Sequence, residues 1–294
     1  MPYINVNDAY ILDNTGKQVD DAVDYALANS NRNLLDNPWW GSGEVVNQRQ
    51  ITAKPSSNGA YCIDRWTWNS GSDANNMSLG ANGITFTRSA SNIWFAQKMA
   101  NPSALVGKKI TGSVMLSDGT IKSGSVVYAS VGSTPTLYQD SAVQIYISSV
   151  GAFSLTIKTT QTIRAVKLEL GSYSTLANDV PPDYGTELLK CARYFLRIGT
   201  TIYFPYGSGI AHNATNIRVL IPTPVQMRTD PSASFSGTLT VRGNGASLSV
   251  SAIAAAYVQK NGVALSVTTT GATTYQSYSL VPTTSGYIDL SADL

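Results

Sequence analysis

The sequence has few charged residues. Asp, Glu, Lys and Arg make up 13% of its 294 residues, about half the share that is usual in soluble domains. The 20 Lys and Arg against 18 Asp and Glu leave a formal net charge of +2. This balance argues against a nucleic-acid-binding protein, which needs a concentrated basic face. The polar surface must come from uncharged side chains, as is common in β-rich extracellular and virion proteins.

Metal ligands and thiols are also scarce. The chain has one histidine, His212, and two cysteines, Cys62 and Cys191. These counts exclude a Cys/His zinc cluster, a multi-histidine metal site and a disulfide scaffold. We expect both cysteines to be buried, reduced and to act as small hydrophobic side chains.

Long apolar segments are missing as well. No run reaches the roughly 18 apolar residues of a membrane span, and residues 1–8 lack the basic and apolar parts of a secretory signal. We therefore expect no membrane insertion and no signal peptide. An extracellular type of surface without an export signal fits a virion protein that is made in the host cytoplasm.

The first regular pattern is helical. Thr15 and Gln18 form a capping box, and apolar residues recur at helical spacing from Val19 to Leu27, which predicts a helix over residues 15–30. So short a helix is marginal alone, and its apolar stripe must pack on other protein. We assign residues 1–32 to an N-terminal attachment or trimerisation segment.

From residue 33 to 178 the pattern has a period of two, with turn signals between the alternating segments. These segments are 84–87, 110–116, 143–147, 153–157 and 166–170. Many short strands at this spacing predict an antiparallel β-sandwich.

A linker with a short helix follows over residues 179–198. Pro181, Pro182 and Gly185 mark the linker, and the apolar stripe from Leu188 to Phe195 predicts a helix over 187–197. Strand patterns then return and predict a smaller antiparallel β domain over 199–294. Its expected strands are 200–206, 216–221, 233–235, 239–242, 247–250, 255–259 and 287–290.

Several strings resemble, in order and spacing, those of bacteriophage and prophage tail fibre (receptor-binding) proteins. They are NLLDNPWW at 33–40 with VNQR at 46–49, YCIDRW at 61–66, KLELGS at 167–172, ELLKCARYF at 187–195 and PVQMRTDP at 224–231. Ala192 and Phe195 replace a Gln and a Tyr that are common in the family. Residues from about 232 onward match nothing in it.

The resemblance implies a jelly-roll domain like a carbohydrate-binding module, and a homotrimer at the tip of a viral appendage. The partners would be a bacterial cell-surface polysaccharide and other tail or baseplate proteins. The C-terminal β domain would be the receptor-binding tip.

Sugar binding needs flat apolar ring faces with planar hydrogen-bonding groups at their rim. Trp68 lies near a polar loop and Trp40 lies beside Trp39, of which only one can face the core. We take Trp68 and Trp40 as candidate ligand contacts and place Trp66 and Trp94 in the core.

In the C-terminal domain, Tyr203 and Tyr206 flank Pro205 and precede a glycine-rich segment. They are candidates for an aromatic binding lip. The sequence does not decide which β domain binds the ligand.

Catalysis is not expected. A glycosidase needs two carboxylates about 5–10 Å apart, and the available ones have other interpretations: Asp64 should pair with Arg65, and Glu169 lies within the last strand of the sandwich. We expect no cofactor, apart from a structural Ca²⁺ that Asp36 and Glu169 could help to hold.

The sequence thus predicts a mainly β protein that recognises a bacterial surface glycan without cleaving it. Two alternatives stay open. One is a glycan depolymerase of the tail, and the other is a structural baseplate or fibre connector without a ligand.

Overall fold

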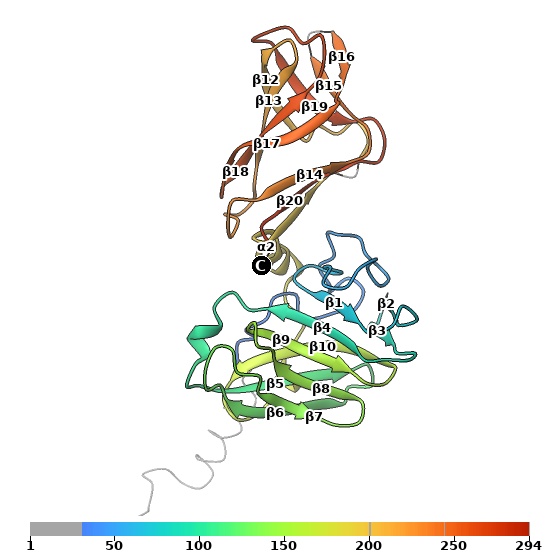
Figure 1. Ribbon diagram of the computed structural model, residues 1–294, viewed down its shortest axis with the longest axis vertical. Coiled ribbons are helices and arrows are strands. Elements are labelled where there is room, and N and C mark those ends of the chain that lie inside the picture. The colour runs from blue at the N-terminus through green and yellow to red at the C-terminus, as the bar shows by residue number, and fades with distance from the viewer. Residues whose placement is uncertain (1–30, 200, 244, 294) are drawn as a thin grey trace, which may run out of the picture.

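The protein is mainly β and its sheets are antiparallel, as predicted. The computed structural model describes residues 31–199, 201–243 and 245–293, so the helix predicted over 15–30 lies outside the described residues. Two β bodies lie at opposite ends of the long axis, with helix α2 between them (Figure 1). None of the helices in these ranges is long and apolar enough to cross a membrane.

The N-terminal body is a sandwich of two five-stranded sheets. The first, here called the open sheet, has the order β1 (Thr67–Ser70), β4 (Ile93–Lys98), β9 (Ala152–Ile157), β8 (Val143–Ile147) and β7 (Thr136–Gln139). The second, here called the covered sheet, has the order β2 (Asn76–Gly80), β3 (Gly83–Thr87), β10 (Gln161–Leu170), β5 (Lys109–Leu116) and β6 (Ile121–Val127). A 3₁₀ helix, η2 (Pro102–Leu105), precedes β5.

Aromatic rings fill the space between the two sheets. Trp66 stacks on Phe95 with ring centroids 5.2 Å apart, and Trp40 meets Trp66 edge to face at 4.9 Å. The indole Nε1 atoms of both tryptophans donate to the carbonyl oxygen of buried Asn37, at 2.9 and 3.0 Å. These bonds satisfy the only polar atoms of the two rings, so the rings can be buried without an unpaired donor.

The outer face of the covered sheet is sealed over β10 and β5 by the chain that leaves β10. The 3₁₀ helix η3 (Leu176–Asn178) brings Leu176 against Trp39 and Ala165 in a small hydrophobic cluster. Beside it, Thr175 donates to the buried carboxylate of Glu169 through its amide and hydroxyl, at 2.8 and 2.6 Å. Charged side chains on this face are therefore inside the protein.

The linking helix differs from its prediction in both bounds. Helix α2 spans Tyr184–Ala192 and begins at Asp183, whose carboxylate accepts a hydrogen bond from the Thr186 amide at 2.8 Å. This N-cap starts the helix three residues earlier than the apolar stripe suggested. Residues 195–197, expected to end the helix, lie instead in strand β11 (Phe195–Ile198), which pairs with β20.

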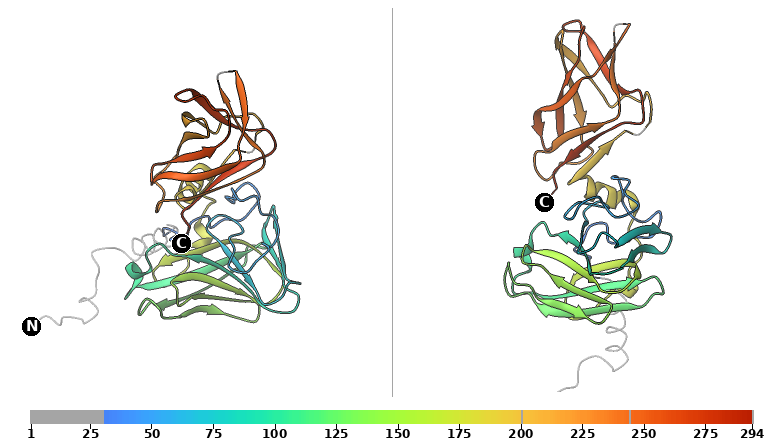
Figure 2. Two further views of the ribbon diagram at one scale, coloured as in Figure 1. Left: turned by 45° about the horizontal axis from the view of Figure 1, so that its top comes forward. Right: turned by 45° about the vertical axis from the view of Figure 1, so that its right-hand side comes forward.

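The C-terminal body has a three-stranded and a seven-stranded sheet. The smaller sheet has the order β11, β20 (Tyr287–Ser291) and β14 (Ser232–Ser236). The larger has the order β16 (Ala246–Ser249), β15 (Leu239–Gly243), β19 (Ser277–Pro282), β12 (Gly207–Asn213), β13 (Asn216–Pro222), β18 (Gly262–Thr268) and β17 (Ala252–Gln259). In both views of Figure 2 this body lies on one side of the sandwich.

The strand expected over 200–206 is wrong. Residues 201–206 form a loop, and β12 begins only at Gly207. Two local features explain the difference: Tyr203 has a positive φ of 65°, and Pro205 has no amide hydrogen to donate to a sheet.

Candidate functional site

The outer face of the open sheet carries a groove, here called the trough, of about 520 Å³. It is lined by Asn58, Tyr61, Thr67, Asn69, Ser70, Trp94, Ala96, Lys98, Tyr146, Ser148, Val150, Ala152 and Ser154. Its floor is built from small side chains, because Ala96 of β4 lies opposite Ser154 of β9, and Ala152 follows on the same face of β9. Small residues on these neighbouring strands leave room above the sheet.

Two aromatic side chains form the walls of the trough. Trp94 stands on β4 opposite Thr156 of β9, and Tyr146 stands on β8 opposite Ser154. Since β9 lies between β4 and β8, the strands that bear these rings are about 10 Å apart. Both rings are half-buried and line the groove, which gives two apolar surfaces with a floor of small side chains between them.

Polar groups at the trough have spare hydrogen-bonding capacity. Within the described ranges, no hydrogen bond forms from the side chains of Asn69 and Lys98, from the indole nitrogen of Trp94 or from the hydroxyl of Tyr146. The Asn58 side chain does have partners: its Nδ2 donates to the carbonyl oxygen of Ser70, and its Oδ1 accepts from the Ser70 amide, at 2.8 Å each. The arrangement can therefore offer donors and acceptors to a ligand that lies along the ring faces.

Trp94 corrects the sequence prediction that placed it in the core. Ile93 and Phe95, its neighbours on β4, are fully buried and face inward, so the alternation of the strand turns Trp94 outward. The apolar run of three residues concealed this alternation. A strict period of two, anchored on Phe95, would have found Trp94.

Trp68 and Trp40 are wrong as ligand contacts. Trp68 is 2% exposed and Trp40 is fully buried. On β1, Trp68 faces inward and stacks on Phe86 at 6.5 Å, while its neighbour Asn69 lines the trough. Neither tryptophan has a free ring face for a sugar.

Tyr203 and Tyr206 do not form a common lip. Tyr206 is 6% exposed, and its hydroxyl donates to the carbonyl oxygen of Gly286. Tyr203 is exposed and lies under the guanidinium of Arg242, 4.5 Å from the ring centre. One tyrosine is thus a packing residue and the other a surface residue.

A second hollow, of about 460 Å³, lies where the two bodies meet. Gln48, Arg197, Phe204 and Tyr206 are among its lining residues. Its main polar groups already have partners: the Arg197 guanidinium binds both carboxylate oxygens of Asp289 at 2.7 Å. The Arg197 guanidinium is therefore less available to a ligand than the polar groups of the trough are.

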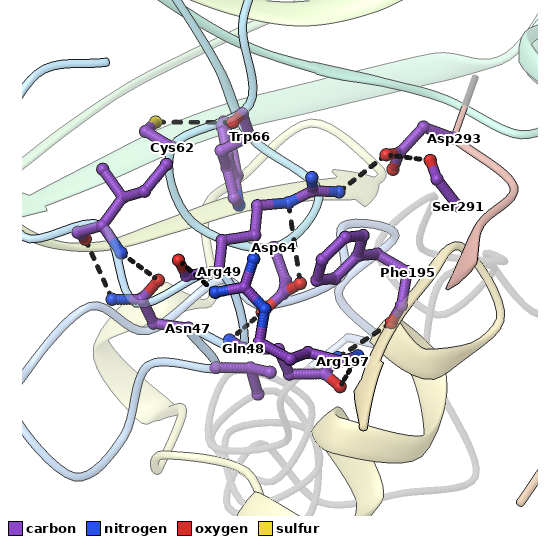
Figure 3. Close-up of polar contacts among 12 residues, drawn as sticks. Asn47, Gln48, Arg49, Cys62, Asp64, Trp66, Phe195, Arg197, Ser291 and Asp293 are labelled. Carbon is purple, nitrogen blue, oxygen red and sulfur yellow. Dashed lines mark hydrogen bonds and ion pairs between the residues drawn. The ribbon is translucent and has the colours of Figure 1, made fainter. Parts of the chain in front are cut away.

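A polar cluster behind this hollow joins the two bodies (Figure 3). Arg49 binds Asp293 at 2.6 Å and lies 3.7 Å over the ring of Phe195. Gln48 donates to the carbonyl oxygen of Phe195 at 2.9 Å, and Arg197 donates to that of Arg49 at 3.0 Å. These contacts connect the sandwich loop at 48–49 with β11 and with the end of the chain.

Asp64 belongs to this cluster and not to an ion pair with Arg65. Its carboxylate accepts a hydrogen bond from the Gln48 amide at 2.6 Å and lies 3.8 Å from Arg49. Arg65, at a positive φ of 74°, turns away and binds Asp36 at 3.1 Å. Burial raises the pKa of Asp64 to about 7, against the opposing effect of the Gln48 amide and Arg49.

Asp36 and Glu169, expected to help hold a calcium ion, have separate partners. Asp36 binds Arg65, and Glu169 accepts two hydrogen bonds from Thr175. Within residues 31–199, 201–243 and 245–293, no group of three or more His, Cys, Asp or Glu is placed to hold a metal ion. Asp36 thus forms an ion pair, and Glu169 holds the loop at Thr175 in place.

Both cysteines are free and buried, as predicted. The Cys62 thiol lies 3.4 Å from the carbonyl oxygen of Trp66, and burial raises its pKa to about 12. Burial also raises the pKa of Cys191. Neither thiol is ionised at neutral pH, which fits a packing role.

A scan against protein-family models and a search of curated proteins found no match to this chain. The resemblance to phage tail fibres therefore depends on the quoted sequence strings alone. The case for a ligand site depends on the trough.

Proposed function

We propose that the trough binds a bacterial surface glycan without cleaving it, and that the protein is the receptor-binding part of a phage tail fibre. The observation that carries this proposal is the pairing of Trp94 and Tyr146 across a floor of small residues. Aromatic faces suit the C–H face of a pyranose, and nearby amides and hydroxyls suit its hydroxyl groups.

The lining of the trough favours binding over hydrolysis. Glycosidases use two carboxyl groups at the scissile bond, and within the described part of the chain the lining contains neither Asp nor Glu. The carboxylates that the sequence offered are elsewhere: Asp64 is buried at the junction, and Glu169 is sealed under Thr175.

In this proposal the protein is a homotrimer, held by the segment 1–32 and attached to other tail or baseplate proteins. Three weak glycan sites on one particle gain avidity when they engage the same surface. Light scattering at micromolar protein should give the mass of a trimer, and a monomer mass would contradict this part of the proposal.

The central test is incubation of the protein with a panel of bacterial cell-wall and capsular polysaccharides, with retention and new reducing ends both recorded. We expect retention without cleavage. New reducing ends would favour the depolymerase alternative, and neither signal would favour a connector.

Two substitutions localise binding to the trough. Trp94→Ala removes a wall and should weaken affinity about 30-fold, the effect of losing a main aromatic contact of about 2 kcal/mol. Ala96→Ile leaves both walls in place and fills the floor, and it should weaken binding as strongly. Tyr173→Ala is the matched control, because Tyr173 is an exposed aromatic residue outside the trough lining. Unchanged retention in the first two variants would remove the trough from the proposal.

A further inference from the structure

Among the described residues, Lys98 is the one charged residue in the lining of the trough. It ends β4 and shares the outward face of that strand with Trp94 and Ala96. Its side chain is exposed. The trough therefore presents two aromatic walls and, at one end, a single positive charge.

The ammonium of Lys98 has no ion pair and no hydrogen bond among the described residues. Two other lysines of the sandwich differ in this respect. Lys122 binds the Asp140 carboxylate at 2.6 Å, and Lys158 donates to the Asp140 carbonyl oxygen at 3.0 Å. The charge of Lys98 is thus available to a ligand, while those of Lys122 and Lys158 are used within the fold.

The backbone at Lys98 is fixed although its side chain is free. Its carbonyl oxygen accepts a hydrogen bond from Arg65 at 2.9 Å. Arg65 is buried, binds Asp36 and lies 3.5 Å over the ring of Tyr194. The backbone at the end of β4 is therefore anchored, which sets the distance between the Cα atoms of Lys98 and Trp94.

We infer that the trough takes an acidic glycan, whose carboxylate or phosphodiester group is bound by Lys98 while its sugar rings lie against Trp94 and Tyr146. This inference rests on the proposed glycan-binding function of the trough. Trp94 and Lys98 are four residues apart on one strand, or about 13 Å. That distance, measured between Cα atoms, can be spanned by a glycan of more than one sugar unit.

The chemistry of Lys98 fits either acidic group. An ammonium binds carboxylate and phosphate oxygens as a compact point charge. The net charge of the whole protein is only +2, so general attraction to polyanions is weak. A salt-dependent affinity would therefore depend mainly on Lys98.

The experiment starts from the polysaccharides that the wild-type protein retains and that Trp94→Ala loses. Affinities are measured for each of them before and after chemical reduction of its carboxyl groups, and for a poly(glycerol phosphate) polymer. A loss on carboxyl reduction identifies a carboxylate ligand. Binding of the phosphate polymer that depends on Trp94 identifies a phosphodiester ligand.

The variants are Lys98→Met, Lys98→Arg and Lys109→Met. We expect Lys98→Met to lower affinity for the acidic glycan about five- to tenfold and to remove most of its salt dependence. Lys98→Arg should keep most of the affinity. Lys109→Met is the matched control, because Lys109 is an exposed lysine on β5 of the covered sheet and its loss changes the net charge equally.

Two outcomes overturn the inference and leave the proposed function intact: retained glycans that are neutral, or acidic glycans whose affinity is equal in Lys98→Met and wild type. Failure of every glycan to bind would instead remove the proposed function, and this inference with it. Because Lys98 and Lys109 are exposed, thermal unfolding should be unchanged in all three variants, which separates binding from folding.

Discussion

The two sheets of the sandwich have similar inner faces, but their outer faces differ in which side chains are buried. Inside, both contribute fully buried apolar side chains, such as Phe86 from the covered sheet and Phe95 from the open sheet. Outside, the covered sheet carries Lys167 and Glu169, both completely buried under the segment 171–179. The open sheet carries Trp94, half-buried beside the trough.

This difference reverses the usual distribution, because the charges are sealed and the aromatic rings are open. Burying a charge is costly unless it is paired, and the covered sheet meets that cost with a closed network around Lys167. Leaving aromatic faces in water forfeits hydrophobic stabilisation. The half-buried aromatic walls of the trough are the basis of the binding site proposed above.

The largest expected effect comes from opening the sealed face. Lys167 donates to Asp179 at 2.6 Å and to Thr175 at 2.9 Å, and lies 3.8 Å from Glu169. Lys167→Ala leaves buried carboxylates without their cation, which should lower the free energy of unfolding by about 3–5 kcal/mol. Urea denaturation measures this change.

Lys122→Ala is the control for that prediction. Lys122 also binds an aspartate, Asp140, at 2.6 Å, but the pair is partly exposed. Its loss should cost about 1 kcal/mol or less. Equal effects of the two substitutions would show that the covered face is not sealed from water.

Much of the inner face could be predicted from the sequence. Alternation located strands such as 143–147 and 153–157, because an inward apolar residue follows each outward polar one. The outer faces could not be predicted in this way. The seal depends on contacts such as Ser113 with Ser174, 61 residues apart, and the sequence gives no sign of which loop returns to which sheet.

The site prediction failed for a related reason. Polar neighbours in the sequence favour Trp68, which lies beside a polar loop, over Trp94, which lies within an apolar run. Facing direction decides the outcome, and it depends on the register of β1 and β4 across the sheet. Tyr146 was not predicted at all, although its outward place in the alternating strand 143–147 was a signal.

The buried carboxyl group of Asp64 should make the stability of the protein depend on pH, whereas binding at the trough should not depend on it. Burial raises the pKa of Asp64 from its ordinary 3.8 to about 7, so the folded protein holds this proton more tightly than the unfolded chain. Ionisation then favours unfolding, and this contribution to stability is largest below pH 3.8 and is lost as the pH rises to about 7. The slope cannot exceed about 1.4 kcal/mol per pH unit for one group.

The measurement compares wild type with Asp64→Asn by urea denaturation between pH 4 and 8. We expect the variant to gain stability relative to wild type as the pH rises, and the gain to level off above pH 7. Glycan affinity should stay constant from pH 5.5 to 7.5, because no Asp, Glu or His of the described residues lines the trough. A difference in stability that does not change with pH would place the Asp64 pKa near its ordinary value.

The smallest effects come from removing one hydroxyl group from each outer face. On the sealed face, Ser113 donates to Ser174 at 2.7 Å and is completely buried. Ser113→Ala should cost about 1 kcal/mol of stability, the net value of one hydrogen bond, and leave glycan affinity unchanged.

On the open face, the Tyr146 hydroxyl forms no hydrogen bond within the described part of the chain, so Tyr146→Phe should leave stability within about 0.5 kcal/mol of wild type. If that hydroxyl bonds the glycan, the same substitution should weaken binding about fivefold. Measuring both variants by denaturation and by glycan retention gives a crossed design, and a Tyr146→Phe variant that loses stability but keeps affinity would assign this wall of the trough to folding instead of recognition.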